Sequence, residues 1–226
     1  MEFNLIEIFH QAPLINKIVL LGMVAMSLWM VYLFIERGMT FSKGSKQSYK
    51  YILSLRDYLS QQKVDEALHT AKNYSHSPVA KVVESGLAAY KQGLEAQALD
   101  GQKDVGNFDV VDSVNRALER VKERETSNLR KGLGGLATIA STAPFVGLLG
   151  TVFGIIGAFG LLKGGGGIEI VGPAIAEALI ATGMGLFIAI PAAMVFNYFT
   201  GRVENMVVDM NDVSSEFLDF VLKEGR

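Results

Sequence analysis

The fold is decided by one long stretch without any charged residue, which reads GLGGLATIASTAPFVGLLGTVFGIIGAFGLL from Gly132 to Leu162. It contains 31 residues, whereas about 20 apolar residues in a helix suffice to cross the hydrocarbon core of a bilayer. A soluble domain rarely buries so long a run without a single charge. The stretch therefore predicts a transmembrane helix over 132–162 and excludes an ordinary soluble globule.

Two further stretches have the same character. The run Ile18–Ile35 has no charged residue, and the run Ile170–Gly201 has only Glu177. A cleaved signal peptide would need a basic start and a small-residue cleavage site, and the first run has neither. The sequence therefore predicts an all-α integral membrane protein with three transmembrane helices, over 18–36, 132–162 and 171–201. A transmembrane β-barrel is excluded, since its strands are short and alternate in polarity.

Composition excludes several classes of function. The chain has 226 residues, a net charge of −2, three histidines and no cysteine. The absence of cysteine excludes disulfides and thiolate chemistry, and the slightly acidic balance argues against a nucleic-acid partner. No phosphate-binding loop and no paired nucleophile and base occur in the apolar runs. We therefore expect neither an enzyme nor a bound metal or cofactor.

The distribution of Lys and Arg predicts the orientation. Many basic residues follow the first span and precede the second, namely Arg37, Lys43, Lys46, Lys50, Arg56, Arg116, Arg120, Lys122, Arg124, Arg130 and Lys131. The segments 1–17 and 163–170 each hold only one, Lys17 and Lys163. The sequence thus predicts that 37–131 and the C-terminal helix 202–226 are cytoplasmic, whereas 1–17 and the 163–170 turn lie on the other side.

The region 37–131 has the pattern of a helical domain. Apolar residues Tyr51, Leu55 and Leu59 recur every fourth position, which marks one helix face. The segments 64–72 and 79–90 predict a helical hairpin, separated at Ser77-Pro78 because the residue before proline avoids the helical region.

The second half of this region changes character twice. Residues 92–108 are rich in glycine and lack periodicity, so a loop is predicted. From Val110 onward Val114, Leu118, Val121 and Leu129 return at helical spacing. With no proline before Gly132, this helix is expected to continue directly into the second span.

Small residues form a stripe on each of the last two spans. The stripe of span two is Gly147, Gly150, Gly154 and Gly157, and that of span three is Ala178, Ala181, Gly185 and Ala189. In lipid, small residues allow helix backbones to approach closely and gain packing. The stripes predict tight packing, either with neighbouring subunits or within a compact monomeric bundle.

Prolines interrupt both spans. Pro144 and Pro191 lie inside them and predict helix kinks, because each removes a backbone hydrogen bond. Pro173 follows the Gly164–Gly167 turn and is suited to the start of a helix.

Three polar residues in the last two spans are the candidates for function. Glu177 is a carboxyl in a membrane helix, which marks an ion or proton route, or else it lies solvated at the outer interface. Thr151 lies on the same face as Gly147 and Gly154, and Thr182 follows Glu177 by five residues. Their hydroxyls either hold water and protons or bond the carbonyl four residues back.

Two long motifs in these spans are similar to a known family. The stretch LATIASTAPFVGLLGTVFGII (136–156), and GPAIAEALIAT (172–182) together with AIPAA (189–193), resemble the MotA/TolQ/ExbB proton-channel family. The resemblance covers the whole predicted topology. The short N-terminal segment and three spans are closest to the ExbB/TolQ branch.

The resemblance implies a function and a set of partners. It implies a homopentamer in the bacterial inner membrane, with the N-terminus periplasmic and the C-terminus cytoplasmic. Thr151, Thr182 and Glu177 would line a central pore holding two ExbD- or TolR-like single-span subunits. Their membrane aspartate would carry most of the protons, and the motor would drive a periplasm-spanning TonB- or TolA-like protein. Membrane lipid and protons are the other partners, and no nucleic acid is implied.

Other functions remain open at this point. A non-conducting membrane scaffold would use the same three residues only for packing. An intramembrane enzyme would need a nucleophile and base that the spans lack. The sequence does not separate an ExbB role in outer-membrane transport from a TolQ role in the envelope or from a gliding or secretion motor.

Overall fold

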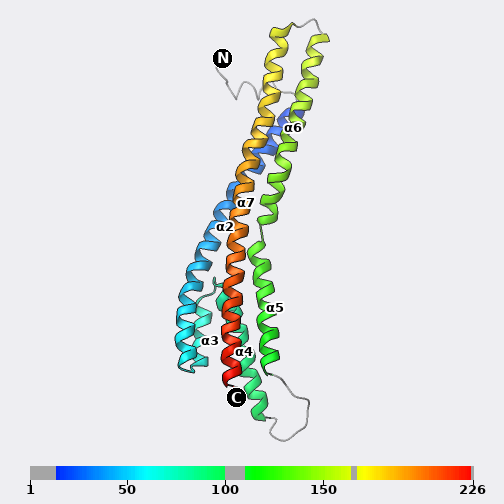
Figure 1. The fold of residues 1–226 in the computed structure, drawn as a ribbon. Coiled ribbons are helices and arrows are strands. Elements are labelled where there is room, and N and C mark those ends of the chain that lie inside the picture. The colour runs from blue at the N-terminus through cyan, green and yellow to red at the C-terminus, as the bar shows by residue number, and fades with distance from the viewer. Residues whose placement is uncertain (1–13, 100–109, 164–166, 225–226) are drawn as a thin grey trace. The chain divides into compact units, whose positions relative to one another are not determined.

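The computed structural model describes residues 14–99, 110–163 and 167–224, and within these ranges every regular element is an α-helix (Figure 1). In chain order the helices are α2 (Leu14–Ser60), α3 (Val64–Asn73), α4 (Pro78–Leu99), α5 (Val110–Arg130), α6 (Leu133–Lys163) and α7 (Ile168–Glu224). The expectation of an all-α chain is confirmed for this part of the molecule.

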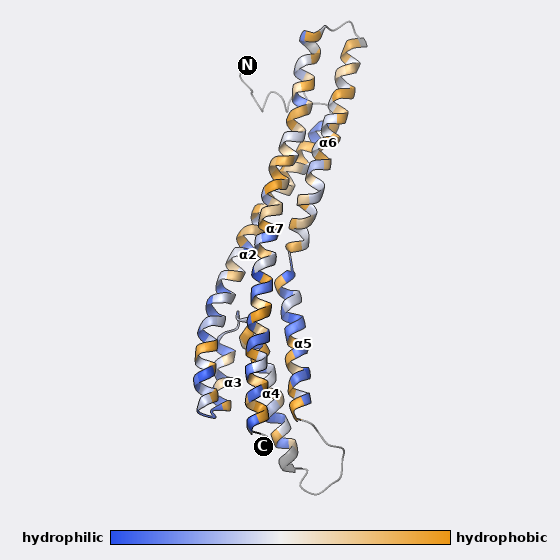
Figure 2. Ribbon diagram, viewed as in Figure 1, coloured by the Kyte–Doolittle hydropathy of each residue, from blue (hydrophilic) through white to orange (hydrophobic). Residues whose placement is uncertain are grey.

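Three helical stretches are long and apolar enough to cross a membrane, namely Leu14–Ser60, Val110–Leu162 and Val171–Lys223. Each contains one of the predicted spans. Figure 2 shows that α6 is apolar over most of its length, whereas α5 alternates between hydrophilic and hydrophobic residues. These properties are those of an all-α membrane protein with helices that extend beyond the bilayer.

The predicted continuous helix from Val110 through the second span is wrong at one point. Helix α5 ends at Arg130 and α6 begins at Leu133. Gly132 between them has a φ of 80°, a left-handed conformation that terminates helices and favours glycine. Its carbonyl then accepts a hydrogen bond from the Gly135 amide at 3.1 Å, which starts the first turn of α6. The absence of proline before Gly132 predicts no break, but the glycine itself makes one.

The chain divides into two compact units. The apolar unit comprises the described residues up to Glu36 together with Gly132–Phe199, and the polar unit comprises Arg37–Lys131 with Thr200–Arg226. The three candidate polar residues lie in the apolar unit, on α6 and α7.

The apolar unit packs the start of α2 against α6 and α7. Its buried core consists of Val19, Met23, Ile139, Ala143, Ala181, Ile188, Ala189 and Ala192. Elsewhere in the unit, a Cβ on Gly135 would lie 3.2 Å from Leu33, and the ring of Phe34 packs against that of Phe199 with centroids 6.1 Å apart. Most of the core side chains are small or unbranched, so the backbones lie close together.

The polar unit contains a core of large side chains. Tyr51, Leu55 and Leu59 are buried, which confirms the first predicted helix face. On the second predicted face Val114, Leu118 and Leu129 are buried, whereas Val121 is half-buried. The Phe217 ring of α7 packs edge-on against Tyr90 of α4, with ring centroids 6.5 Å apart. Large buried side chains of this kind form the core of a helical domain.

The turn between α3 and α4 is built as predicted from Ser77-Pro78. Ser77 caps α4, because its hydroxyl accepts the Ala80 amide at 3.0 Å, and Pro78 occupies the first helical position. The Ser77 hydroxyl also bonds that of Ser48 on α2 at 2.8 Å. Helix α4 continues to Leu99, so the loop predicted from residue 92 is wrong for 92–99, and the rest of it, 100–108, falls outside the described residues.

Candidate functional site: polar residues of the apolar unit

The glycine stripe of α6 brings the helix backbone directly against α7. A Cβ on Gly147 would lie 2.7 Å from the carbonyl oxygen of Ala181, and one on Gly154 would lie 2.6 Å from the Cβ of Ala178. A Cβ on Gly185 would lie 2.6 Å from the carbonyl oxygen of Ala143. Real Cβ atoms do not approach other atoms so closely, so this contact between α6 and α7 requires glycine at these positions.

The rest of the stripe has different surroundings. A Cβ on Gly150 would meet the Cβ of Ala181 at 2.9 Å and Val19 of α2 at 3.1 Å. Gly157 is exposed in the single chain. Pro144 lies inside α6, and Pro173 and Pro191 lie inside α7. Pro173 is therefore not at the helix start, because α7 already begins at Ile168.

The close approach brings the two threonines together. Thr151 of α6 is only 8% exposed, and its hydroxyl contacts the hydroxyl of Thr182 on α7. The Thr151 oxygen lies 3.0 Å from the carbonyl of Ala178 on α7, and the Thr182 oxygen lies 3.3 Å from the carbonyl of Gly147 on α6. Each hydroxyl thus reaches across to the other helix.

The number of protons on the two hydroxyls shows how Thr151 and Thr182 are connected. A hydroxyl has one proton to donate and two lone pairs with which to accept. The Thr151 hydroxyl oxygen also lies 3.3 Å from the carbonyl oxygen of Gly147, four residues earlier on the same helix. This is the bond expected of a threonine that bonds only to its own helix. Since the hydroxyls contact each other, one must donate to its partner and the other to a carbonyl. The two threonines form a short hydrogen-bonded chain between α6 and α7.

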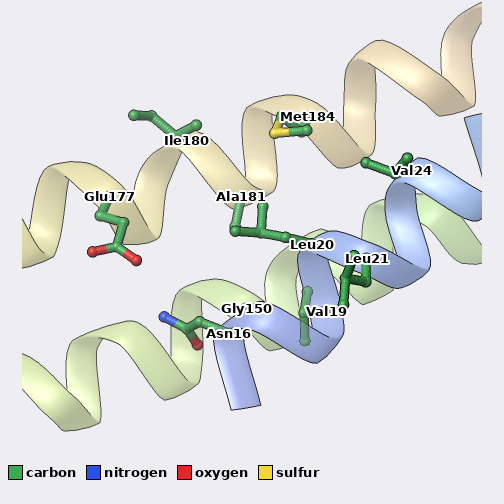
Figure 3. A pocket seen from close by; sticks show the side chains of 10 residues that line it. All are labelled: Asn16, Val19, Leu20, Leu21, Val24, Gly150, Glu177, Ile180, Ala181 and Met184. Carbon is green, nitrogen blue, oxygen red and sulfur yellow. The ribbon is translucent and has the colours of Figure 1, made fainter. Parts of the chain in front are cut away.

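Glu177 points to a different place from the threonines. It lines a pocket of about 190 Å³ together with residues of α2, α6 and α7 (Figure 3). The wall is otherwise apolar except for Asn16, and it consists of Val19, Leu20, Leu21, Val24, Gly150, Ile180, Ala181 and Met184. The Glu177 carboxyl is half-buried, and its Oε1 atom is buried without a hydrogen-bond partner.

Asn16 is the residue that sequence reasoning missed. It lies in the first turn of α2, is 7% exposed, and its side chain faces the Glu177 carboxyl in the same pocket. The sequence predicts that 1–17 lies outside the membrane, so Asn16 is not among the predicted site residues. Its position two residues before the apolar run, in register with Val19 and Met23, was the available signal.

The site thus has two parts. Thr151 and Thr182 bridge α6 and α7, while Glu177 and Asn16 bridge α7 and α2. Among the described residues, no group of three or more His, Asp or Glu could hold a metal ion. The groups present accept and donate protons, which is what a hydrogen-bonded proton path requires.

The site lies in a stretch of the chain that is similar to a known family. Residues 74–212, more than half of the chain, match the profile of the MotA/TolQ/ExbB proton channel family. The chain belongs to this family. The matched stretch contains α6 and the part of α7 up to residue 212.

Individual relatives carry two different names. A biopolymer transport protein ExbB of Pseudomonas putida is 30% identical over 96% of this chain and 63% of its own length. An ExbB of Xanthomonas campestris pv. campestris is 42% identical over 50% of this chain and 46% of its own length. A Tol-Pal system protein TolQ of Pseudomonas aeruginosa is 31% identical over 96% of this chain and 94% of its own length. The chain thus spans about half to two thirds of these ExbB proteins and nearly all of the TolQ protein.

Proposed function

We propose that this chain is the proton-channel subunit of an inner-membrane motor of the ExbB/TolQ type. The observation that carries the proposal is the hydroxyl pair Thr151–Thr182 between α6 and α7, in predicted spans (132–162 and 171–201) whose only charged residue is Glu177. Polar groups within membrane spans are expensive and mark ion and proton routes. The proposal is supported by the family match over 74–212, the stretch in which these residues lie.

The proposed assembly is a homopentamer in which α6 and α7 of each copy surround a pore. Two single-span ExbD- or TolR-like subunits occupy the pore, and the proton carrier is an aspartate of that partner. The N-terminus is periplasmic, and the polar unit together with the C-terminus is cytoplasmic. The excess of Lys and Arg between the first and second spans supports this orientation.

The proposed work is done by the proton motive force. One charge moved across 100 mV supplies about 2.3 kcal/mol, so a few protons per step are enough to drive a conformational change. The motor energises a periplasm-spanning TonB-like protein for outer-membrane transport. A TolA-like partner and a role in the envelope are the second candidate, which the nearly full-length match to a TolQ protein favours.

The experiment is proton flux into liposomes that contain the purified chain, with and without a co-purified ExbD- or TolR-like subunit. The proposal predicts flux, driven by an imposed potential, that requires both proteins. A complex that assembles but conducts no protons would contradict the motor hypothesis and favour the non-conducting membrane scaffold. Pull-down of a TonB-like or a TolA-like protein by the same complex distinguishes the two roles.

A further inference from the structure

The geometry points to Asn16 as the positioning residue for Glu177: we propose that its amide holds the carboxyl on the α2 side of α7, apart from the threonine pair. The inference deepens the proposed function, because it assigns a member of the first span to the polar path. It rests on the close-up of the pocket, in which Asn16 and Glu177 face each other at one end (Figure 3).

Burial argues that Asn16 is not there for packing. Its side chain is 93% removed from solvent in a pocket whose remaining wall, apart from Glu177, is apolar. Its Oδ1 atom is buried and has no hydrogen-bond partner. A buried amide with an unsatisfied oxygen destabilises a fold relative to an apolar residue of the same shape. A leucine at position 16 would therefore suit the pocket better if packing were the only requirement.

The surroundings of Asn16 include all three helices of the apolar unit. It lines one pocket with Gly150 of α6 and Glu177 of α7. A Cβ on Gly154 would lie 3.4 Å from its amide nitrogen, an ordinary van der Waals distance, so Asn16 lies directly beside α6. Asn16 thus has α6 on one side and faces the carboxyl on the other.

The two threonines do not hold the Glu177 carboxyl. Their hydroxyls are directed to each other and to the carbonyls of Ala178 and Gly147. Asn16 is the polar side chain that lines the pocket together with Glu177. The direction of the carboxyl therefore depends on α2, a helix in which the sequence predicts no functional residue.

An amide suits this position chemically. It offers two N–H donors to an ionised carboxylate and one carbonyl acceptor to a protonated carboxyl. Rotation about its terminal bond exchanges the two ends, and nothing else needs to move. Asn16 is able to hold Glu177 in either protonation state, which neither leucine nor aspartate can do.

The first test is spectroscopic and needs no conduction. In the purified chain, the infrared carboxyl band of Glu177 is the band lost in Glu177→Gln. We expect Asn16→Leu to shift that band, Asn16→Gln to restore it at least in part, and Ser27→Ala, which removes a polar group elsewhere on α2, to leave it in place. An unshifted band in a folded Asn16→Leu protein would overturn the proposal, whether or not the complex conducts protons.

The second test is a double-mutant cycle on proton flux in the complex with its single-span partner. Asn16→Leu is expected to reduce flux about tenfold, the value of one hydrogen bond to a charged group. The same substitution in a Glu177→Gln background should have no further effect, because Asn16 acts through Glu177. Equal losses in both backgrounds would contradict the proposal, since they would show a structural role. If Asn16→Leu fails to fold, Asn16→Ala, which also removes the amide, carries the same cycle.

Discussion

The apolar and polar units pack their helices with opposite kinds of side chain. In the apolar unit the closest approach occurs where side chains are missing, as at Gly147 and Gly185, while Phe145 and Phe187 are 70% and 79% exposed in the single chain. In the polar unit large rings such as Phe217 are fully buried.

The difference follows from the solvent. Water drives large apolar side chains inward, whereas lipid tails solvate them on the outside. In lipid, helices gain van der Waals packing where small residues let their backbones approach. In the apolar unit the contact between helices therefore leaves space for a few polar groups, of which Thr151 is buried and Thr182 and Glu177 are half-buried.

The largest effect is expected from removing a ring in the polar unit. Phe217→Ala should lower the free energy of local unfolding by about 3–5 kcal/mol, because a fully buried ring is replaced by a cavity. Hydrogen exchange of the α4 and α5 amides measures the loss. Val208→Ala is the control, since Val208 on the same helix is 54% exposed and should change little. Equal losses of unfolding free energy from Phe217→Ala and Val208→Ala would contradict the view that large buried rings hold the polar unit together.

A smaller effect is expected from adding a methyl group in the apolar unit. Gly185→Ala should destabilise the packing of α6 against α7 by about 1–3 kcal/mol, because its Cβ would lie 2.6 Å from the Ala143 carbonyl. Gly183→Ala, two residues earlier, meets nothing within 4 Å and should be neutral. Unfolding of the detergent-solubilised protein compares the pair. If Gly185→Ala were as stable as Gly183→Ala, the small-residue stripe would not be a contact surface.

Much of this contrast could be predicted from the sequence. The charge-free runs gave the spans, and the spacing of Gly147, Gly150 and Gly154 identified the face of α6 that contacts α7, because these features are local and periodic. The break at Gly132 and the proximity of Asn16 to Glu177 could not be predicted in the same way. The break depends on one left-handed residue, and the proximity brings together residues 161 positions apart, which no pattern along the chain reports.

A weak pH dependence is expected in the polar unit. Neighbouring protein atoms partly desolvate the Asp209 carboxyl on α7 and raise its pKa, and the like charge of Asp212 adds to this while Arg202 opposes it. A raised folded-state pKa means that the folded chain binds the proton more readily than the unfolded chain. Stability is therefore highest below the unfolded-state pKa of Asp209 and falls as the pH rises through the folded-state value.

Asp209→Asn removes this dependence. Near neutral pH it should increase the free energy of unfolding by at most a few tenths of a kcal/mol, because solvent screens an exposed charge. In acid it should have no effect, because Asp209 is then protonated. Thermal unfolding from pH 4 to pH 8 measures the difference. Asp219→Asn, on the same helix, controls for the loss of one negative charge. A gain that persists in acid would show that the effect is not titration of Asp209.

The most direct test of the central claim is proton flux through complexes in which Thr151 is replaced by valine or by serine. Valine keeps the shape and should cost only about 0.6 kcal/mol of stability, the typical value of one hydrogen bond inside a membrane protein. The account predicts that Thr151→Val assembles normally and loses most of the flux, and that Thr151→Ser, which retains the hydroxyl, conducts. Undiminished flux through an assembled Thr151→Val complex would contradict a path that includes the bond between Thr151 and Thr182.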